Sequence, residues 1–600
     1  MNARRNILVV VVFLSCFLIR GGWQSIQAKE RSGQPNIILV MTDDQGYWDT
    51  GISGNPHIET PTIDRMAAEG VTFTRFYANM VCAPTRAGLM TGRHYLRTGL
   101  YNTRFGGDTL GSQETTIAQV LKSTGYKTGL FGKWHLGRYA QYQPHRRGFD
   151  HFFGHYHGHI ERYTNPDQVV VNGQPVETRG YVTDLFTDAA IDFIKSSQSQ
   201  PFFCFLAYNA PHSPFLLDTS HYGQPKGDQL IKKYLDKGLP LREARIYAMV
   251  ERIDENLKRL LQSVHDLGID QETVVIFTSD NGGVSRGYKA GLKGSKASAY
   301  EGGIRVPFVV RWPGHFPAGK TTDAMVAQTD LFPTFCELAG IKVPAKLKLD
   351  GKSILSLMEQ GEGKSPHKYL YHTWDRYTPN PYHRWSIHGE RFKLVLHNSQ
   401  GKKKKIEPMG QLYDLSVDPG ETQDLAKQYP EEAKQLRTEF LRWFDDVTAG
   451  QVYQPMPIPV GDDQEPAVEL QPSWAILKGG SLEYSFDGYD WDTIDNWQSN
   501  QGTAVWQLDV LKAGRYAVEM SYGYRSAQPE TGQLQISVGQ EKILCQLPMS
   551  TSQNVFFKTK AGILELKRGR QALEVRATKA FGIKGLRLNS IWLKKLELKK

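Results

Sequence analysis

The sequence lacks the cysteines that a disulfide framework needs. Its 600 residues contain five, Cys16, Cys82, Cys204, Cys336 and Cys545, which are widely separated. Disulfide-stapled domains are short chains with closely spaced cysteines, so this class is excluded. The fold must depend on a hydrophobic core instead. A content of 40% hydrophobic and 22% charged residues is typical of a globular protein, and the length allows several domains.

Long apolar runs and Asn-x-Ser/Thr glycosylation motifs are also absent. The longest N-terminal apolar stretch, residues 7–19, is too short to cross a membrane comfortably. It follows Arg4 and Arg5 and precedes small or polar residues up to Ala28, which is the pattern of a secretory signal. We therefore expect a signal peptide over residues 1–28, no membrane span, and export to the periplasm or the extracellular space.

The excess of positive charge is not confined to one part of the chain. The net charge is +10, yet residues 461–600 carry 18 Lys and Arg against 16 Asp and Glu, so the excess is spread over the chain. This suits an anionic substrate, although a solvated surface explains it equally well. Nothing resembles a nucleic-acid-binding module, and the run Lys402–Lys405 is interpreted as an exposed loop.

Apolar strands alternate with helical segments in the first half, which predicts an α/β sheet. Four expected strands, 36–41, 127–131, 202–207 and 273–277, each run into polar side chains. Ligands of open α/β sheets bind beyond the carboxyl ends of the strands, so we predict one polar site at that edge. Its expected members come from all four strand ends: Asp43, Asp44, Lys133, His135, Asn209, His212, Asp280 and Asn281.

Two helices are predicted from local signals. Residues 241–267 have a long helical periodicity whose apolar stripe is interpreted as core packing. Thr62 is expected to cap a helix that ends near Gly70. Residues 365–450 are predicted to form a smaller subdomain, with antiparallel strands and a helix over 431–444.

A Pro-rich linker is expected over residues 451–466, and the character of the chain changes beyond it. Segments such as 516–522, 534–538 and 572–576 alternate with period two, which predicts an all-β sandwich over 467–600. Its layout is similar to that of carbohydrate-binding modules. Four aromatic side chains could contact a glycan or pack the sandwich core, and the sequence leaves both open: Tyr489, Trp491, Trp497 and Trp506.

One cysteine stands in a distinctive context. Cys82 is followed by Pro84 and Arg86, and the segment closes with Leu89-Met90-Thr91-Gly92. A lone cysteine is usually a buried thiol. Here, however, the segment resembles the first signature of the type I sulfatases, in which formylglycine-generating enzyme oxidises the cysteine to an aldehyde. The segment 125–137, which contains Gly132-Lys133-Trp134-His135, resembles the second signature.

The resemblance covers roughly residues 35–445. It implies an alkaline-phosphatase-like α/β core over 29–364 and a small α+β C-terminal subdomain over 365–450, here followed by the all-β sandwich. It implies hydrolysis of sulfate esters, with a sulfated carbohydrate or an aryl sulfate as substrate. Animal lysosomal sulfatases are normally glycosylated, so the missing glycosylation motif favours a bacterial exported protein.

The resemblance also implies a metal site and a modified nucleophile. Its metal ligands correspond to Asp43, Asp44, Asp280 and Asn281, together with residue 82. Oxygen ligands suit a hard divalent cation, and one Ca²⁺ per chain is expected. An Asp-Asp pair elsewhere is usually a turn or a helix cap, but two polar pairs after apolar strands favour metal.

Further roles follow from the same resemblance. Arg86 would hold the hydrated aldehyde, and Lys133 and Lys296 would bind the sulfate, with Lys293 as a nearby competitor for the second position. His212 would donate a proton to the leaving alcohol. His135 would accept the proton whose removal expels sulfate.

Three side chains of the subdomain, Trp374, His383 and Arg384, either shape a sugar subsite or simply pack. Gly158 stands where some sulfatases have a serine. Two other functions stay open at this point. One is a phosphodiesterase or phosphonate hydrolase of the same superfamily, some members of which share the oxidised cysteine. The other is a carbohydrate-binding protein whose catalytic half is inactive.

Overall fold

A ten-stranded mixed sheet organises the N-terminal half. The computed structural model describes residues 33–217, 226–397, 409–486, 488, 491–498, 501–525, 532–550, 552–579 and 585–597. The expected signal peptide and the Lys402–Lys405 run lie outside these residues. Among the helices within the described ranges, none has the length and hydropathy of a membrane-spanning segment.

The centre of this sheet is parallel, as the sequence predicts. Its strand order is β11-β2-β10-β9-β1-β8-β4-β5-β6-β7. The five parallel strands are β9 (Thr273–Ser279), β1 (Asn36–Thr42), β8 (Phe202–Ala207), β4 (Lys127–Lys133) and β5 (His151–His155). The outer strands are β11 (Lys320–Thr322), β2 (Val71–Phe73), β10 (Phe308–Arg311), β6 (Val170–Val171) and β7 (Gln174–Pro175). In register, Leu39 faces Phe205 on β8 and Ile276 on β9.

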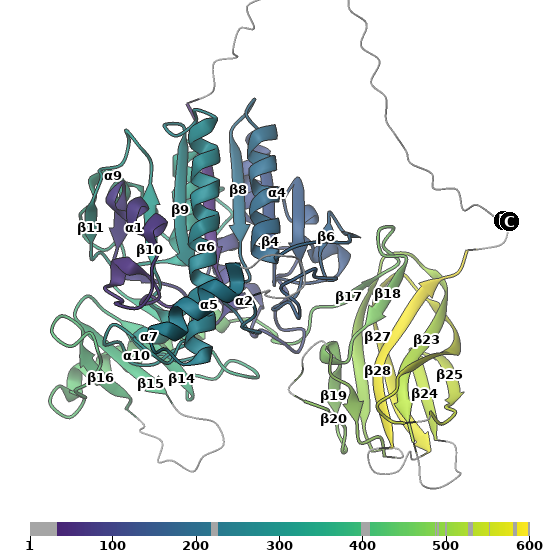
Figure 1. Cartoon of the computed structure of the whole chain (residues 1–600). Helices are drawn as coiled ribbons and strands as arrows, with labels where there is room; N and C mark the ends of the chain where they lie inside the picture. Colours follow the sequence, from purple (N-terminus) through teal and green to yellow (C-terminus); the bar gives the residue numbers. More distant parts are fainter. Residues whose placement is uncertain are drawn as a thin grey trace, which may run out of the picture. The chain divides into compact units, whose positions relative to one another are not determined.

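Helices cover both faces of the sheet, because successive side chains of a strand point to opposite sides. On β1, Ile38 and Val40 pack into one core cluster and Leu39 and Met41 into the other. The first cluster includes α1 (Pro61–Ala68), α4 (Val182–Ser196) and α6 (Leu241–Asp266). The second includes α2 (Cys82–Thr91), α3 (Ile117–Ser123) and α8 (Leu331–Leu338). Figure 1 shows α4 and α6 running alongside β8 and β9.

The predicted long helix is α6, but the start of α1 differs from the prediction. The N-cap of α1 is Thr60, Pro61 opens the helix, and Thr62 lies inside it. The Asp254 carboxylate of α6 accepts hydrogen bonds from the backbone N–H of Thr62 at 3.0 Å and of Ile63 at 2.8 Å. A residue far along the chain therefore satisfies the N–H groups that the first turn leaves unpaired.

The expected subdomain is a four-stranded antiparallel sheet with one long helix, which confirms its α+β character. Its strands are β13 (Leu370–Thr373), β14 (Arg384–His388), β15 (Phe392–His397) and β16 (Gln411–Asp414), and its helix is α10 (Pro430–Thr448). Trp385 stacks on Phe440 with ring centroids 4.0 Å apart, so α10 closes one face of this sheet. The remaining α-helices and strands before β13 are β3 (Phe76–Tyr77), α5 (Lys226–Asp236), α7 (Glu301–Ile304), β12 (Val326–Ala327) and α9 (Leu355–Gln360).

The C-terminal region is the predicted β-sandwich. One sheet has the order β17 (Ile458–Val460), β22 (Thr503–Val510), β27 (Gly569–Lys579), β24 (Gln533–Val538), β25 (Glu541–Gln546), with β19 (Ile476–Lys478) also on β22. The other has the order β20 (Glu483–Tyr484), β21 (Ile494–Asp495), β28 (Leu586–Lys595), β23 (Gly514–Tyr524), β26 (Phe557–Leu566), with β18 (Ala467–Leu470) also on β28. Part of the expected linker belongs to this sandwich, because β17 pairs with β22 and buries Ile458 and Val460. A strand at the sheet edge tolerates the proline between them.

The sandwich packs against the segment that follows β4. The Tyr139 hydroxyl donates to the Glu469 carbonyl oxygen at 2.8 Å, and the Tyr139 ring meets Trp474 edge to face at 4.6 Å. Tyr142 donates to the Pro457 carbonyl oxygen at 2.8 Å. Both tyrosines belong to the sandwich core, and Gln34–Lys600 form one compact unit.

Two of the four singled-out aromatics of the sandwich are core residues. Trp497 and Trp506 are 1% and 0% exposed, and their indole N–H groups donate to backbone carbonyl oxygens. Packing is therefore their role. Trp491 is 47% exposed, and Tyr489 lies outside the described residues.

Removal of the long-range cap should destabilise the fold. In Asp254→Ala the N–H groups of Thr62 and Ile63 stay buried without an acceptor, which costs about 1–3 kcal/mol. We expect a lower thermal unfolding midpoint by calorimetry. Asp266→Ala, at the exposed end of the same helix, is the control and should leave the midpoint unchanged. Equal midpoints for both variants would contradict the capping role.

Candidate active site

The carboxyl ends of four parallel strands deliver the side chains that the sequence places at this edge. Asp43 and Asp44 directly follow β1, and Asp280 and Asn281 directly follow β9. Lys133 is the last residue of β4, and His212 follows β8. These six side chains, together with Cys82, Arg86, His135 and Lys296, are buried or half-buried. The structure thus brings these ten predicted site residues to one region.

Cys82 is the first residue of α2 and is 3% exposed. Pro84 fits the first turn of this helix, where a backbone N–H has no intrahelical acceptor. Burial raises the pKa of the Cys82 thiol, although Lys133 and Lys296 oppose the shift. Reactive cysteines have a lowered pKa, because the thiolate is the nucleophile. The unmodified thiol at this position is therefore poorly suited to attack a substrate.

Arg86 lies one turn along α2 and holds Asp280. Its Nε and Nη2 donate to Asp280 Oδ2 at 3.0 and 2.8 Å, and its Nη1 donates to the Lys133 carbonyl oxygen at 2.9 Å. Arg86 is 1% exposed and Asp280 is fully buried. A buried guanidinium needs such a set of acceptors, so this interaction fixes α2 against the ends of β4 and β9.

Two lysines neutralise the carboxylates of β1. Lys133 Nζ lies 2.6 Å from Asp43 Oδ2, and Lys296 Nζ lies 2.5 Å from Asp44 Oδ1. The competing residue Lys293 lies elsewhere, because its ammonium group donates to the Tyr413 hydroxyl at 2.9 Å. Lys296 is thus the lysine of this loop that reaches the site.

Two buried oxygens of the cluster are suited to a cation. Within the described part of the chain, Asp43 Oδ1 and Asn281 Oδ1 have no hydrogen-bond partner. Buried polar atoms are nearly always satisfied, so these two call for a ligand. Ligand atoms of Asp43, Cys82 and Asp280 lie within 4.8 Å of one another, as do those of Asp43, Asp44 and His212. The oxygen-rich set fits a hard divalent cation.

The charges in the cluster shift two carboxyl groups in opposite directions. Burial and the neighbouring Asp43 charge raise the pKa of Asp280 to about 6, against the effect of Arg86. Burial also disfavours ionisation of Asp44, but Lys296 and His212 outweigh it and lower the pKa of Asp44 to about 2. Crowded carboxylates thus depend on nearby positive charge to stay ionised.

His212 borders both the cluster and the pocket. Its Nδ1 donates to the Ser213 carbonyl oxygen at 2.7 Å, which fixes the tautomer, and its Nε2 lies 3.7 Å from Asp44 Oδ2. Burial and the Lys296 charge lower the pKa of His212 to about 3. Negative charge brought by a ligand beside Lys296 would oppose this shift and favour protonation of Nε2.

His135 is held on the other side of the site in a left-handed backbone conformation, with φ of 57°. Its Nε2 lies 3.3 Å from the Thr103 carbonyl oxygen and therefore carries the proton. Nδ1 is buried without a partner in the described structure, so its lone pair is available to accept a proton. Burial, reinforced by Lys133 and Arg86, lowers the pKa of His135.

Gly158 makes room for this imidazole. A Cβ atom at Gly158 would lie 2.6 Å from His135 Nε2 and Cε1. A serine at this position, as in some sulfatases, therefore could not coexist with the present His135 ring. The His135 ring therefore explains why residue 158 is a glycine, and the sequence alone does not reveal this contact.

The site opens into a pocket of about 560 Å³. Cys82, His135, His212 and Lys296 line it, and Trp374 joins them from the subdomain, whereas His383 and Arg384 do not. Sequence reasoning missed most of its other walls, which come from separate loops: Thr103, Arg104, Asp108, Phe215, Arg242, Val284 and Phe486. No local pattern marks these residues, because the tertiary fold alone brings them together.

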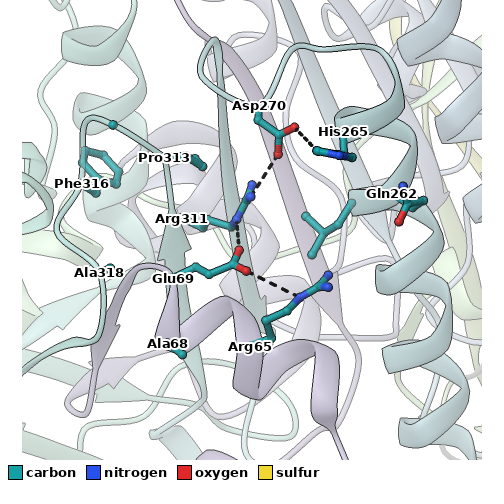
Figure 2. Close-up of a pocket in the computed structure, with 12 residues that line it drawn as sticks. Arg65, Ala68, Glu69, Gln262, His265, Asp270, Arg311, Pro313, Phe316 and Ala318 are labelled. Atoms are coloured by element: carbon teal, nitrogen blue, oxygen red, sulfur yellow. Dashed lines mark hydrogen bonds and ion pairs between the residues drawn. The ribbon is translucent and has the colours of Figure 1, made fainter.

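A second pocket lies at the opposite ends of β9 and β10, and Figure 2 shows its polar wall. Arg311 bridges Glu69 at 2.6 Å and Asp270 at 3.0 Å. Asp270 also pairs with His265 at 3.2 Å, and Arg65 lies 3.8 Å from Glu69. These acidic and basic side chains pair with one another and link the surface elements around the pocket. Their charges cancel, so the pocket presents no net charge to a ligand.

Two family profiles match the chain. One is described as Sulfatase and matches residues 35–341, and the other, N-sulphoglucosamine sulphohydrolase C-terminal, matches residues 295–445. N-acetylgalactosamine-6-sulfatase of Mus musculus is 35% identical over 365 residues, which are 55% of this chain and 67% of that protein. The match thus spans about two thirds of that relative's length.

Two further proteins are similar over a larger share of their own length. Arylsulfatase A of Homo sapiens is 32% identical over 455 residues, covering 65% of this chain and 83% of that protein. The structure of Ps i-CgsB in complex with k-i-k-neocarrahexaose has a TM-score of 0.61 and 29% identity, and the match covers 70% of this chain and 95% of that chain. The matched profile and the two relatives named as sulfatases support sulfuric ester hydrolase activity.

A side chain at residue 158 should disturb His135. In Gly158→Ala the new methyl group would push the ring from its place, and such a displacement lowers turnover by roughly 10- to 100-fold. The measurement is kcat on a sulfated substrate. Gly389→Ala, whose Cβ would make only ordinary contacts, is the matched control. Full activity of Gly158→Ala would show that the position of His135 is unimportant.

Proposed function

Because the chain belongs to the sulfatase family, we propose that it is an exported sulfatase that hydrolyses sulfate esters of carbohydrates. Residue 82, oxidised to formylglycine, serves as its nucleophile, and one Ca²⁺ occupies the carboxylate cluster. The observation that carries the proposal is the meeting of Cys82 with Asp43, Asp280, Arg86 and the two lysines at one strand edge.

Ca²⁺ is proposed because of the chemistry of the donors. Asp43, Asp44, Asp280 and Asn281 offer carboxylate and amide oxygens, and two of these oxygens lack partners in the described structure. Residue 82 would complete the set. A bound Ca²⁺ supplies positive charge that polarises sulfate oxygens and the nucleophile.

Oxidation of Cys82 is proposed because its surroundings suppress thiolate chemistry. The thiol is buried and its pKa is raised. The family's formylglycine supplies a hydrated aldehyde whose hydroxyl is the attacking group. Pro84 and Arg86 match the pattern that formylglycine-generating enzyme recognises, so this enzyme is the proposed maturation partner.

The chain's own cations would hold the sulfate group. The ammonium groups of Lys133 and Lys296 each have three N–H donors, and the contacts with Asp43 and Asp44 leave donors for a sulfate oxygen. Their fixed charge is aimed at the place where negative charge accumulates in the reaction.

The two histidines would move protons on different sides of the site. Nε2 of His212 borders the pocket and would protonate the leaving alcohol, because the bound anion favours its protonated form. Nδ1 of His135 has an available lone pair and would remove a proton from the group at residue 82.

A carbohydrate is the substrate class best supported by the relatives. One is named N-acetylgalactosamine-6-sulfatase, and another was solved with k-i-k-neocarrahexaose. A phosphodiesterase of the superfamily is the second candidate, but the matched profiles and named relatives favour sulfate. A purely carbohydrate-binding role has less support, because the side chains proposed for catalysis lie close to one another at one strand edge.

Loss of the cation should affect both activity and stability. Exhaustive chelation is expected to abolish turnover and lower the thermal midpoint, because Asp43, Asp44 and Asp280 would then repel one another. Elemental analysis should find one Ca²⁺ per chain, and Asp280→Ala should lose it. Asp330→Ala, which removes a buried carboxylate paired with His367, should keep the ion. A metal-free protein with full activity would disprove the calcium site.

Active protein should carry formylglycine at residue 82. Peptide mass spectrometry is expected to detect the aldehyde, and Cys82→Ala should abolish turnover without lowering the thermal midpoint. Cys545→Ala, which removes a thiol of the sandwich, should retain both the aldehyde and the activity. A fully active preparation that contains only unmodified Cys82 would refute the nucleophile assignment.

A further inference from the structure

The C-terminal sandwich contributes two aromatic side chains to the wall of the catalytic pocket. Trp491 and Phe486 line the same cavity as Cys82 and Lys296. They are 47% and 69% exposed, whereas Cys82 at the floor is 3% exposed. The pocket thus has a charged, buried floor and an apolar, accessible outer wall.

This outer wall is held in place by the fold. Trp491 and Phe486 lie between β20 and β21, which pair as an antiparallel hairpin. The Phe105 N–H of the catalytic domain donates to the Gly488 carbonyl oxygen at 3.1 Å, and the Phe105 ring lies 5.3 Å from that of Tyr484. The hairpin is therefore tied to the loop that forms the other side of the pocket.

Trp491 is also connected to His212 through one intermediate ring, that of His159. It meets His159 edge to face at 4.7 Å, and His159 lies 6.5 Å from His212 in a stacked arrangement. The proposed proton donor to the leaving alcohol is His212. The group attached to that alcohol would consequently extend toward Trp491.

An aromatic face beside polar side chains is suited to a sugar ring. The C–H groups of a pyranose can pack on an indole, while its hydroxyls bond to polar neighbours such as Arg104, Asp108 and Arg242. We propose that Trp491, assisted by Phe486, forms a sugar-stacking subsite at the outer wall of the pocket, which binds the ring next to the sulfated sugar and so selects the carbohydrate part of the substrate. This inference rests on the proposed function and assigns the sandwich a direct part in specificity.

Binding to a protein that cannot turn over tests the subsite directly. In the Cys82→Ala background, calorimetry would measure the affinity for a panel of sulfated oligosaccharides. Adding Trp491→Ala should weaken binding about three- to tenfold, and Trp491→Phe should recover most of the loss. Phe556→Ala, an exposed aromatic of the sandwich outside the pocket, should leave the affinity unchanged.

Kinetics separates stacking from a structural role. In the mature enzyme, Trp491→Ala should raise KM more for a sulfated disaccharide than for the sulfated monosaccharide, with kcat less affected. Equal loss on both substrates, or unchanged affinity in Trp491→Ala, would overturn the subsite and leave the sulfatase proposal standing. If the Cys82→Ala protein binds no sulfated oligosaccharide, both the substrate class and the subsite fail.

Discussion

Compensation of three buried carboxylates is the constraint on which the site depends. Asp43, Asp44 and Asp280 meet because β1 and β9 are parallel neighbours that end at the same edge. Their mutual repulsion in a buried setting would be costly without cations. Arg86 forms an ion pair with Asp280, and the remaining two carboxylates each pair with a lysine, Lys133 or Lys296. The positions of α2, the end of β4 and the Lys296 loop all follow from this requirement.

The same arrangement links charge balance to substrate recognition. The cations that hold the carboxylates are the groups that would bind an anionic ester. Two oxygens that have no hydrogen-bond partner among the residues the structure describes are available to a divalent ion. The histidines flank this charged floor, and the pocket opens between the loops toward an apolar wall. In the proposed function, the sulfate and the sugar would therefore be recognised separately, at different depths of the pocket.

Much of this was accessible from the sequence, because the signals are local. Each strand that ends at the site is a short apolar run followed by polar residues, and Cys82 lies in a compact sequence motif. Interactions between residues far apart in the chain could not be predicted from the sequence. The Asp254 carboxylate that accepts from the first turn of α1 lies on a distant helix. The choice of Thr62 as the N-cap was wrong for a local reason, because Thr60 precedes Pro61 at the start of the helix. Trp491 and Trp497 have the same side chain, and only the packing of the sandwich shows that one is exposed and the other buried.

The central claim is that the cluster of buried carboxylates and paired cations is the catalytic site for a sulfate ester. A parallel assay of 4-nitrophenyl sulfate, 4-nitrophenyl phosphate and bis(4-nitrophenyl) phosphate on the mature protein tests it most directly, with Cys82→Ala as the blank. The account predicts that the sulfate ester is hydrolysed with the highest kcat/KM and that the blank is inactive. Faster hydrolysis of either phosphate ester, or no hydrolysis by protein that carries the aldehyde and the metal, would contradict it.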